Sequence, residues 1–192
     1  MFIDWSTWAV NRLKTLTYDE RDGKGGTGLC SRFQNKVYYF REGLTLSYSG
    51  FYAPNLRLNS LGVFDVNGSS VFSKFNNHMI LGNFVCKLIK FLGKNFIDHT
   101  IVFQVDENKE LPLLSTVSDE VVTLVNKIIA KQQENPRYDY LTNEQKEIDQ
   151  IIYQMYGLNE SDILEVETWY ARRYPKLAHL CNIKNSTEDQ IS

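Results

Sequence analysis

Apolar and polar residues alternate through much of the segment 38–72. Aromatic and β-branched side chains recur there at every second position, and Gly, Ser, Asn and Pro residues separate three segments. This pattern predicts three short strands, within 38–48, 51–57 and 62–72. One face of such a sheet can pack against a core, while the other face and the turns present hydroxyl, amide and arginine side chains to a partner.

Apolar residues that recur three or four positions apart predict helices on both sides of this segment. Residues 1–18 fit one helical face, although their first residues fit the end of a strand equally well. Residues 79–92 predict a buried helix that ends at Gly93, where a left-handed residue commonly closes a helix. A polar, glycine-rich loop is expected over 19–28, and a further strand over 100–105.

The remainder of the chain has the spacing of helices throughout. Ser118 is expected to cap the first of these helices, and a capping box that starts at Thr142 to begin the second. Gly157 is expected to end the second helix, and Asn159 to begin a third that stops before Pro175.

Strands therefore concentrate in the first part of the chain and helices in the second. The predicted fold class is α+β, with a mixed α/β domain over 1–115 and a helical region over 116–192. Strands and helices alternate too rarely for a doubly wound parallel sheet. A chain of 192 residues with 43% apolar composition is long and apolar enough to bury a core.

Composition narrows the classes of function. A formal net charge of -2 does not indicate nucleic-acid binding, so any basic surface is local or is completed by another part of a larger protein. The 3 cysteines are far apart, as expected of reduced thiols in the cytoplasm. The chain has no signal sequence and no run near the ~18 apolar residues of a membrane span, so a soluble cytoplasmic protein is expected.

Residues with catalytic chemistry are sparse. The histidines are scattered, and neither a zinc spacing nor a Gly-x-Gly-x-x-Gly turn occurs. Residues 135–138 resemble the Asn-Pro-Pro-Tyr motif of amino-methyltransferases, but no strand precedes them and Arg137 replaces the second proline, so a linker between helices is expected. Asp98, Glu107 and Lys109 have the elements of a metal-dependent nuclease site, although a solvated turn explains the last two equally well.

Basic and aromatic side chains around the predicted sheet could contact DNA. Arginine and asparagine bind guanine and adenine edges bidentately, while lysine and hydroxyl groups position the backbone. This set comprises Arg32, Arg41, Tyr48, Tyr52, Arg57 and Lys74. The tyrosines fit half-buried strand positions as well, and the arginines could serve only solubility.

The same region resembles the specificity region of a known family. The matching motifs, in order, are Phe-Arg-Glu-Gly-Leu-Thr-Leu-Ser at 40–47, Arg57, and Gly-Val-Phe-Asp-Val-Asn-Gly-Ser-Ser-Val-Phe at 62–72. They look like the corresponding run of adenine-specific DNA methyltransferases, namely type IIG restriction-modification enzymes and PglX, the methylase of bacteriophage exclusion systems. Weaker matches extend from Trp5 to 148–158, so the resemblance covers nearly the whole chain. Leu46 replaces a usual tryptophan, which alters either local packing or a base contact.

The resemblance implies a target-recognition domain at 1–115 and a helical brace or spacer at 116–192, both parts of a larger phage-defence enzyme. S-adenosylmethionine is expected in a missing catalytic domain, so this chain alone is expected to hold no cofactor and no catalytic residue. Its expected partners are double-stranded DNA and that missing domain. The candidate DNA contacts are Arg32, Asn35, Ser47, Tyr48, Tyr52, Asn55, Arg57 and Lys74.

Two other functions stay open at this point. A protein-interaction module would use the helical region to dock a partner, and a DNA affinity that depends on sequence and salt would argue against it. A metal-dependent nuclease would show Mg²⁺-dependent cleavage that is lost in Lys109→Ala.

Overall fold

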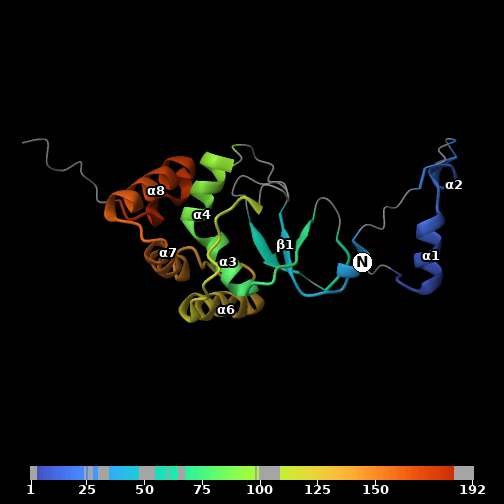
Figure 1. Cartoon of the computed structure of the whole chain (residues 1–192), viewed down its shortest axis with the longest axis horizontal. Helices are drawn as coiled ribbons and strands as arrows, with labels where there is room; N and C mark the ends of the chain where they lie inside the picture. The colour runs from blue at the N-terminus through green and yellow to red at the C-terminus, as the bar shows by residue number, and fades with distance from the viewer. Residues whose placement is uncertain are drawn as a thin grey trace, which may run out of the picture. The chain divides into compact units, whose positions relative to one another are not determined.

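The computed structural model of the chain describes residues 4–23, 25, 28–29, 35–47, 55–59, 61–64, 68–97, 99 and 109–183 (Figure 1). The chain divides into two compact units, Met1–Tyr39 and Phe40–Ser192, and each is described by itself. The described residues combine helices with a small antiparallel sheet, so the predicted α+β class is confirmed.

The elements described in the first unit are the helices α1 (Thr7–Thr15) and α2 (Tyr18–Asp22) and the 3₁₀ turn η1 (Lys36–Tyr38). α1 confirms the helix predicted near the N-terminus. The loop predicted over 19–28 is wrong at its start, because α2 occupies it. Thr17 and Glu20 form a capping box there: the Thr17 hydroxyl accepts from the Glu20 backbone at 3.3 Å, and the Glu20 carboxylate accepts from the Thr17 backbone at 2.9 Å.

The sheet of the second unit consists of β1 (Leu44–Leu46), β2 (Leu56–Leu58) and β3 (Ser70–Val71). Its order is β2-β1-β3, all antiparallel, and Thr45 pairs with Arg57 on one side and with Ser70 on the other. β1 and β3 lie within predicted segments and β2 extends one residue beyond its own; all three are shorter than predicted among the described residues. The first begins late because η1 precedes it and Phe40 has a left-handed φ of 60°. The strand predicted over 100–105 lies outside the described residues.

The single helix predicted over 79–92 is in fact two, α3 (Asn77–Val85) and α4 (Lys87–Leu92). Cys86 between them is extended, with φ -62° and ψ 138°. The carboxylate of Asp149, distant in sequence, accepts a hydrogen bond from the Lys87 backbone at 2.9 Å and so caps α4. The predicted helix end at Gly93 is also wrong: Gly93 is right-handed, and the π-helical segment η2 (Gly93–Ile97) follows.

The last helices are α6 (Asp119–Glu134), α7 (Glu144–Met155) and α8 (Glu160–Arg173), followed by the 3₁₀ segment η3 (Pro175–Leu180). The Ser118 cap is confirmed, because its hydroxyl accepts from the Val121 backbone. The left-handed Gly157 and the Asn159 capping box are confirmed as well. Residues 135–138 lie in the connection between α6 and α7, as predicted.

The capping box predicted from Thr142 does not form. Its hydroxyl donates instead to the Asp139 carboxylate at 2.6 Å, and Asn143 is the residue that precedes α7. Glu144, in the first turn, is buried and accepts from the Tyr138 hydroxyl at 2.8 Å. Local competition for the threonine hydroxyl therefore shifts the helix start by about one residue.

One hydrophobic core joins the sheet to the helices of the second unit. Leu44 of β1 belongs to the same buried cluster as Ile89 of α4, Val125 of α6 and Ile152 of α7. α3 approaches α6 so closely that a Cβ on Gly82 would lie 2.3 Å from a methyl group of Val121. Side chains from both sides of residue 115, where a domain boundary is predicted, belong to this core.

Candidate functional site

Five of the eight candidate DNA contacts are described by the structure; Arg32, Tyr48 and Tyr52 lie outside the described residues. Asn35 belongs to the first unit, where it precedes η1 with a left-handed φ of 54°. Lys74 is exposed between β3 and α3. These two candidates belong to different compact units.

The other three candidates lie together around β2. The Ser47 backbone donates to the Asn55 carbonyl at 3.0 Å, which extends the pairing of β1 with β2 by one step. Arg57 is exposed, while Ser47 and Asn55 are half-buried. β2 is an outer strand of the described sheet.

The residues of the possible nuclease site are only partly described. Asp98 and Glu107 lie outside the described residues, and Lys109 is exposed. Within the described ranges, no three His, Cys, Asp or Glu side chains are grouped so that they could hold a metal ion.

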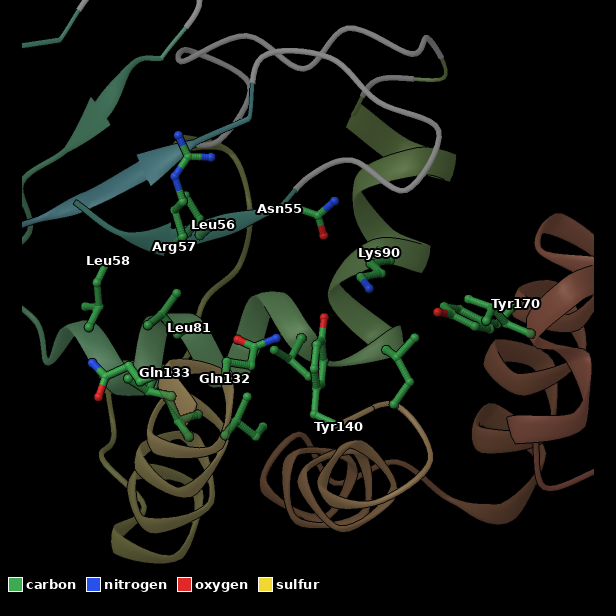
Figure 2. A pocket seen from close by; sticks show the side chains of 16 residues that line it. Asn55, Leu56, Arg57, Leu58, Leu81, Lys90, Gln132, Gln133, Tyr140 and Tyr170 are labelled. Carbon is green, nitrogen blue, oxygen red and sulfur yellow. The ribbon is translucent and has the colours of Figure 1, made fainter. Parts of the chain in front are cut away.

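A cavity of about 770 Å³ opens between β2 and the helices of the second unit (Figure 2). Asn55 and Arg57 line it from the strand, and Gln132 and Gln133 from the last turn of α6. Most of its wall is apolar and comes from α3, α6 and η3, through Leu81, Val85, Val125, Ile128, Ile129 and Leu177. The cavity thus combines a polar rim with an apolar wall, which is the usual make-up of a ligand pocket.

Lys90 of α4 is the one buried cation in the described lining of this cavity, with 4% of its surface exposed. Figure 2 shows its amine directed into the open space, level with the hydroxyl end of Tyr170. The amine lies 5.9 Å from the centre of the Tyr170 ring, and no hydrogen bond or ion pair joins it to a described residue. Burial lowers the pKa of Lys90, and the carboxylate of Asp149 opposes that shift.

A second group of buried charges joins α4, α7 and α8. The amine of Lys87 lies 2.8 Å from the Glu167 carboxylate and 3.3 Å from that of Asp149, and all three side chains are at most 3% exposed. The amine also donates to the Leu180 carbonyl at 3.3 Å, and the Tyr153 hydroxyl donates to Glu167 at 3.0 Å. We call Lys87, Asp149 and Glu167 the buried charge network. It fixes three helices against one another.

Comparisons with family models, with curated proteins and with solved structures find no match for this chain. Its function therefore rests on its own residues. Within the described part of the chain, no helix is both long and apolar enough to cross a membrane.

Sequence reasoning missed Lys90 and the buried charge network. The available signal was the spacing of Lys87, Lys90 and Lys94, which recur three and four positions apart inside the most apolar helical stretch. Residues at this spacing share one helix face. All three lysines are at most 4% exposed, so the spacing marked buried cations.

Burial sets the ionisation of the network. Removal from water raises the pKa of Asp149 to about 6, although Lys87 lowers it in part. Burial alone would lower the pKa of Lys87, but the carboxylates of Asp149 and Glu167 outweigh it and raise this pKa. The network consequently contains one carboxyl group that titrates near neutral pH.

Asp149 makes folding stability depend on pH in an unusual direction. Because its pKa is higher in the folded protein than in the unfolded chain, its contribution is complete below about pH 4 and is lost as the pH rises through about 6. We expect the wild type to gain about 2 kcal/mol of unfolding free energy, relative to Asp149→Asn, between about pH 7 and about pH 4.5. Urea unfolding of both proteins at both pH values measures this. An equal difference at the two pH values would contradict it.

Proposed function

We propose that this chain recognises the sequence of double-stranded DNA, as the target-recognition region of an adenine-specific DNA methyltransferase of the type IIG restriction-modification or PglX kind. The observation that supports this most is that Asn55 and Arg57, at β2, line the same cavity as Gln132 and Gln133, in the last turn of α6; we call these four residues the polar rim. An arginine fork matches the acceptor pair of guanine, and a carboxamide matches the donor and acceptor of adenine. The rim therefore holds the side-chain types that distinguish bases, on a strand and at a helix end.

In this proposal, the rest of the enzyme supplies what the chain lacks. Lys74 binds the DNA backbone, but a net charge of -2 gives too little attraction for tight binding, so the parent enzyme completes the basic surface. The parent's catalytic domain binds S-adenosylmethionine and transfers the methyl group, in the service of cytoplasmic defence against phage. Leu46 is 1% exposed, which supports an effect of the replaced tryptophan on packing.

Selection of bound duplexes from a random DNA library at low salt tests the proposal. We expect enrichment of one short asymmetric motif, because a single rim has no two-fold symmetry. Failure of the folded chain to enrich any sequence would mean that binding requires the missing domain of the parent enzyme, or would favour the protein-interaction module.

Arg57 is the rim residue whose substitution is expected to weaken DNA binding most. If it binds a guanine edge, Arg57→Ala should weaken binding to the selected site by about 1–3 kcal/mol and relax specificity at one position. Arg172→Ala is the matched control, because Arg172 is equally exposed but lies in the last turn of α8, outside the described lining of the cavity. Titration of the selected duplex and a scrambled duplex separates the roles: equal losses on both would assign Arg57 to phosphate, and no loss would remove it from the interface.

A further inference from the structure

The inner part of the cavity has a chemistry that base reading does not use. Asn55 and Arg57 lie at the strand side, whereas Lys90 projects from α4 on the side where Tyr140 and Tyr170 lie (Figure 2). A lysine that is 4% exposed is rare in a folded protein unless a partner accompanies its charge.

No described side chain accompanies Lys90 in this way. The neighbouring Lys87 is held by both carboxylates of the buried charge network, at 2.8 Å and 3.3 Å. Lys90 has no ion pair within such a distance among the described residues, although the charge of the Asp149 carboxylate acts on it; the Tyr170 ring centre lies 5.9 Å from its amine. The ring face attracts a cation weakly compared with an anion in direct contact. The cavity therefore offers an anion a cation that is already desolvated.

We propose that this cavity binds a small organic acid with an apolar body, whose acid group pairs with the amine of Lys90. The apolar body contacts the wall formed by α3 and α6, where Val85, Val125 and Ile129 line the cavity. A volume of about 770 Å³ lies within the range of pockets that hold small molecules.

Charge and burial together determine this class of ligand. A wholly polar anion would leave the apolar wall in contact with water, and an uncharged apolar molecule would leave the Lys90 amine without a partner. An acid with an apolar body satisfies both surfaces. The proposed ligand site shares this cavity with Asn55 and Arg57 but relies on Lys90 and the apolar wall, which base recognition does not use.

A pair of fluorescent probes tests the site in the whole chain. Anilinonaphthalenesulfonate has an apolar aromatic body and one anionic group, and phenylnaphthylamine has the same body without the anion. Both increase in fluorescence when they leave water. We expect Lys90→Met to weaken binding of the anionic probe by about tenfold or more and to leave the neutral probe within about twofold.

Lys131→Met is the matched control, because Lys131 lies on α6 with half of its side chain exposed and does not line the cavity. This control should leave the binding of both probes unchanged. Equal affinity of wild type and Lys90→Met for the anionic probe would overturn the proposal, as would failure of both probes to bind the folded wild type.

A measurement on the wild type alone covers the case in which Lys90→Met does not fold. Decanoate and decanol share one apolar chain, so they can compete with bound phenylnaphthylamine in parallel titrations. Decanol is the less water-soluble of the two and would win in a cavity without a usable cation. We expect decanoate to displace the probe at about tenfold lower concentration. The opposite order would overturn the proposal and would leave the DNA selection experiment unaffected.

Discussion

Replacing Lys87 with methionine is expected to lower the free energy of unfolding by about 3–5 kcal/mol at neutral pH. The substitution keeps most of the volume of the side chain but removes the cation of the buried charge network. Asp149 and Glu167 would then face each other's charge at 2% and 1% exposure, and the Leu180 carbonyl would lose a donor. Urea unfolding of the two proteins, followed by circular dichroism, measures the difference.

The same substitution on the surface provides the control. Lys131 lies 3.9 Å from the exposed carboxylate of Glu134, and such pairs contribute about 0–1 kcal/mol, so Lys131→Met should change stability by no more than that. A loss under about 1 kcal/mol for Lys87→Met as well would mean that the network contributes nothing specific to folding.

A double-mutant cycle with Glu167→Gln separates the network from simple loss of packing. Glutamine keeps the shape of the side chain and can still accept from the Tyr153 hydroxyl, which now donates at 3.0 Å. If Lys87 and Glu167 act as a pair, the double variant should lose about 1–3 kcal/mol less than the sum of the single variants. Additive losses would assign each side chain an independent role.

Signals that lie within one helical turn were sufficient to predict several helix ends. Ser118 and Asn159 cap helices because their side chains reach backbone N–H groups two or three residues ahead. Gly157 closes α7 because it adopts a φ of 70°, at which glycine meets no Cβ clash. These outcomes depend on neighbours in the sequence, so the sequence alone shows them.

Ends that depend on distant residues could not be predicted in this way. The break at Cys86 is stabilised by a hydrogen bond from the Lys87 backbone N–H to the Asp149 carboxylate. These two residues are 62 positions apart in the sequence. Without knowledge of that contact, the continuous apolar spacing favours one uninterrupted helix. Tertiary hydrogen bonds overrode the local preference.

In the candidate site too, residues marked by a local sequence pattern were predicted, and one that depends on tertiary structure was missed. Asn55 and Arg57 were predicted because polar side chains interrupt an apolar alternation on a strand, a pattern that is visible locally. Lys90 was missed because its function, on the present proposal, depends on a cavity lined by seven separate segments. The spacing of the lysines could have indicated their burial, but no local signal shows that space remains beside the amine of Lys90.

Leu44→Ala is expected to destabilise the whole second unit, and not the sheet alone, by about 2–5 kcal/mol. The Leu44 side chain is fully buried in β1 and belongs to the core that also contains residues of α3, α4, α6 and α7. Because the sheet is small and shares this core, it has no separate cluster with which to unfold independently. We therefore expect a single unfolding transition in Leu44→Ala, with a midpoint at a lower urea concentration by every spectroscopic probe.

Trp169 allows the test to be made far from the substitution. The chain has 3 tryptophans, so replacing Trp5 and Trp8 with phenylalanine leaves Trp169 of α8, which packs edge-on against Phe91 at 5.4 Å, as the only indole. Its fluorescence should report the same shift in Leu44→Ala as far-ultraviolet circular dichroism does.

Leu58→Ala is the matched control, because Leu58 is the cross-strand partner of Leu44 but is 39% exposed. Its loss should stay below about 1 kcal/mol, since little additional apolar area leaves water. In Leu44→Ala, the midpoint measured by circular dichroism could shift while the midpoint measured by Trp169 fluorescence stays unchanged. That outcome would show that the helices fold independently of the sheet. That result would support the predicted division after residue 115 as a boundary between folding units.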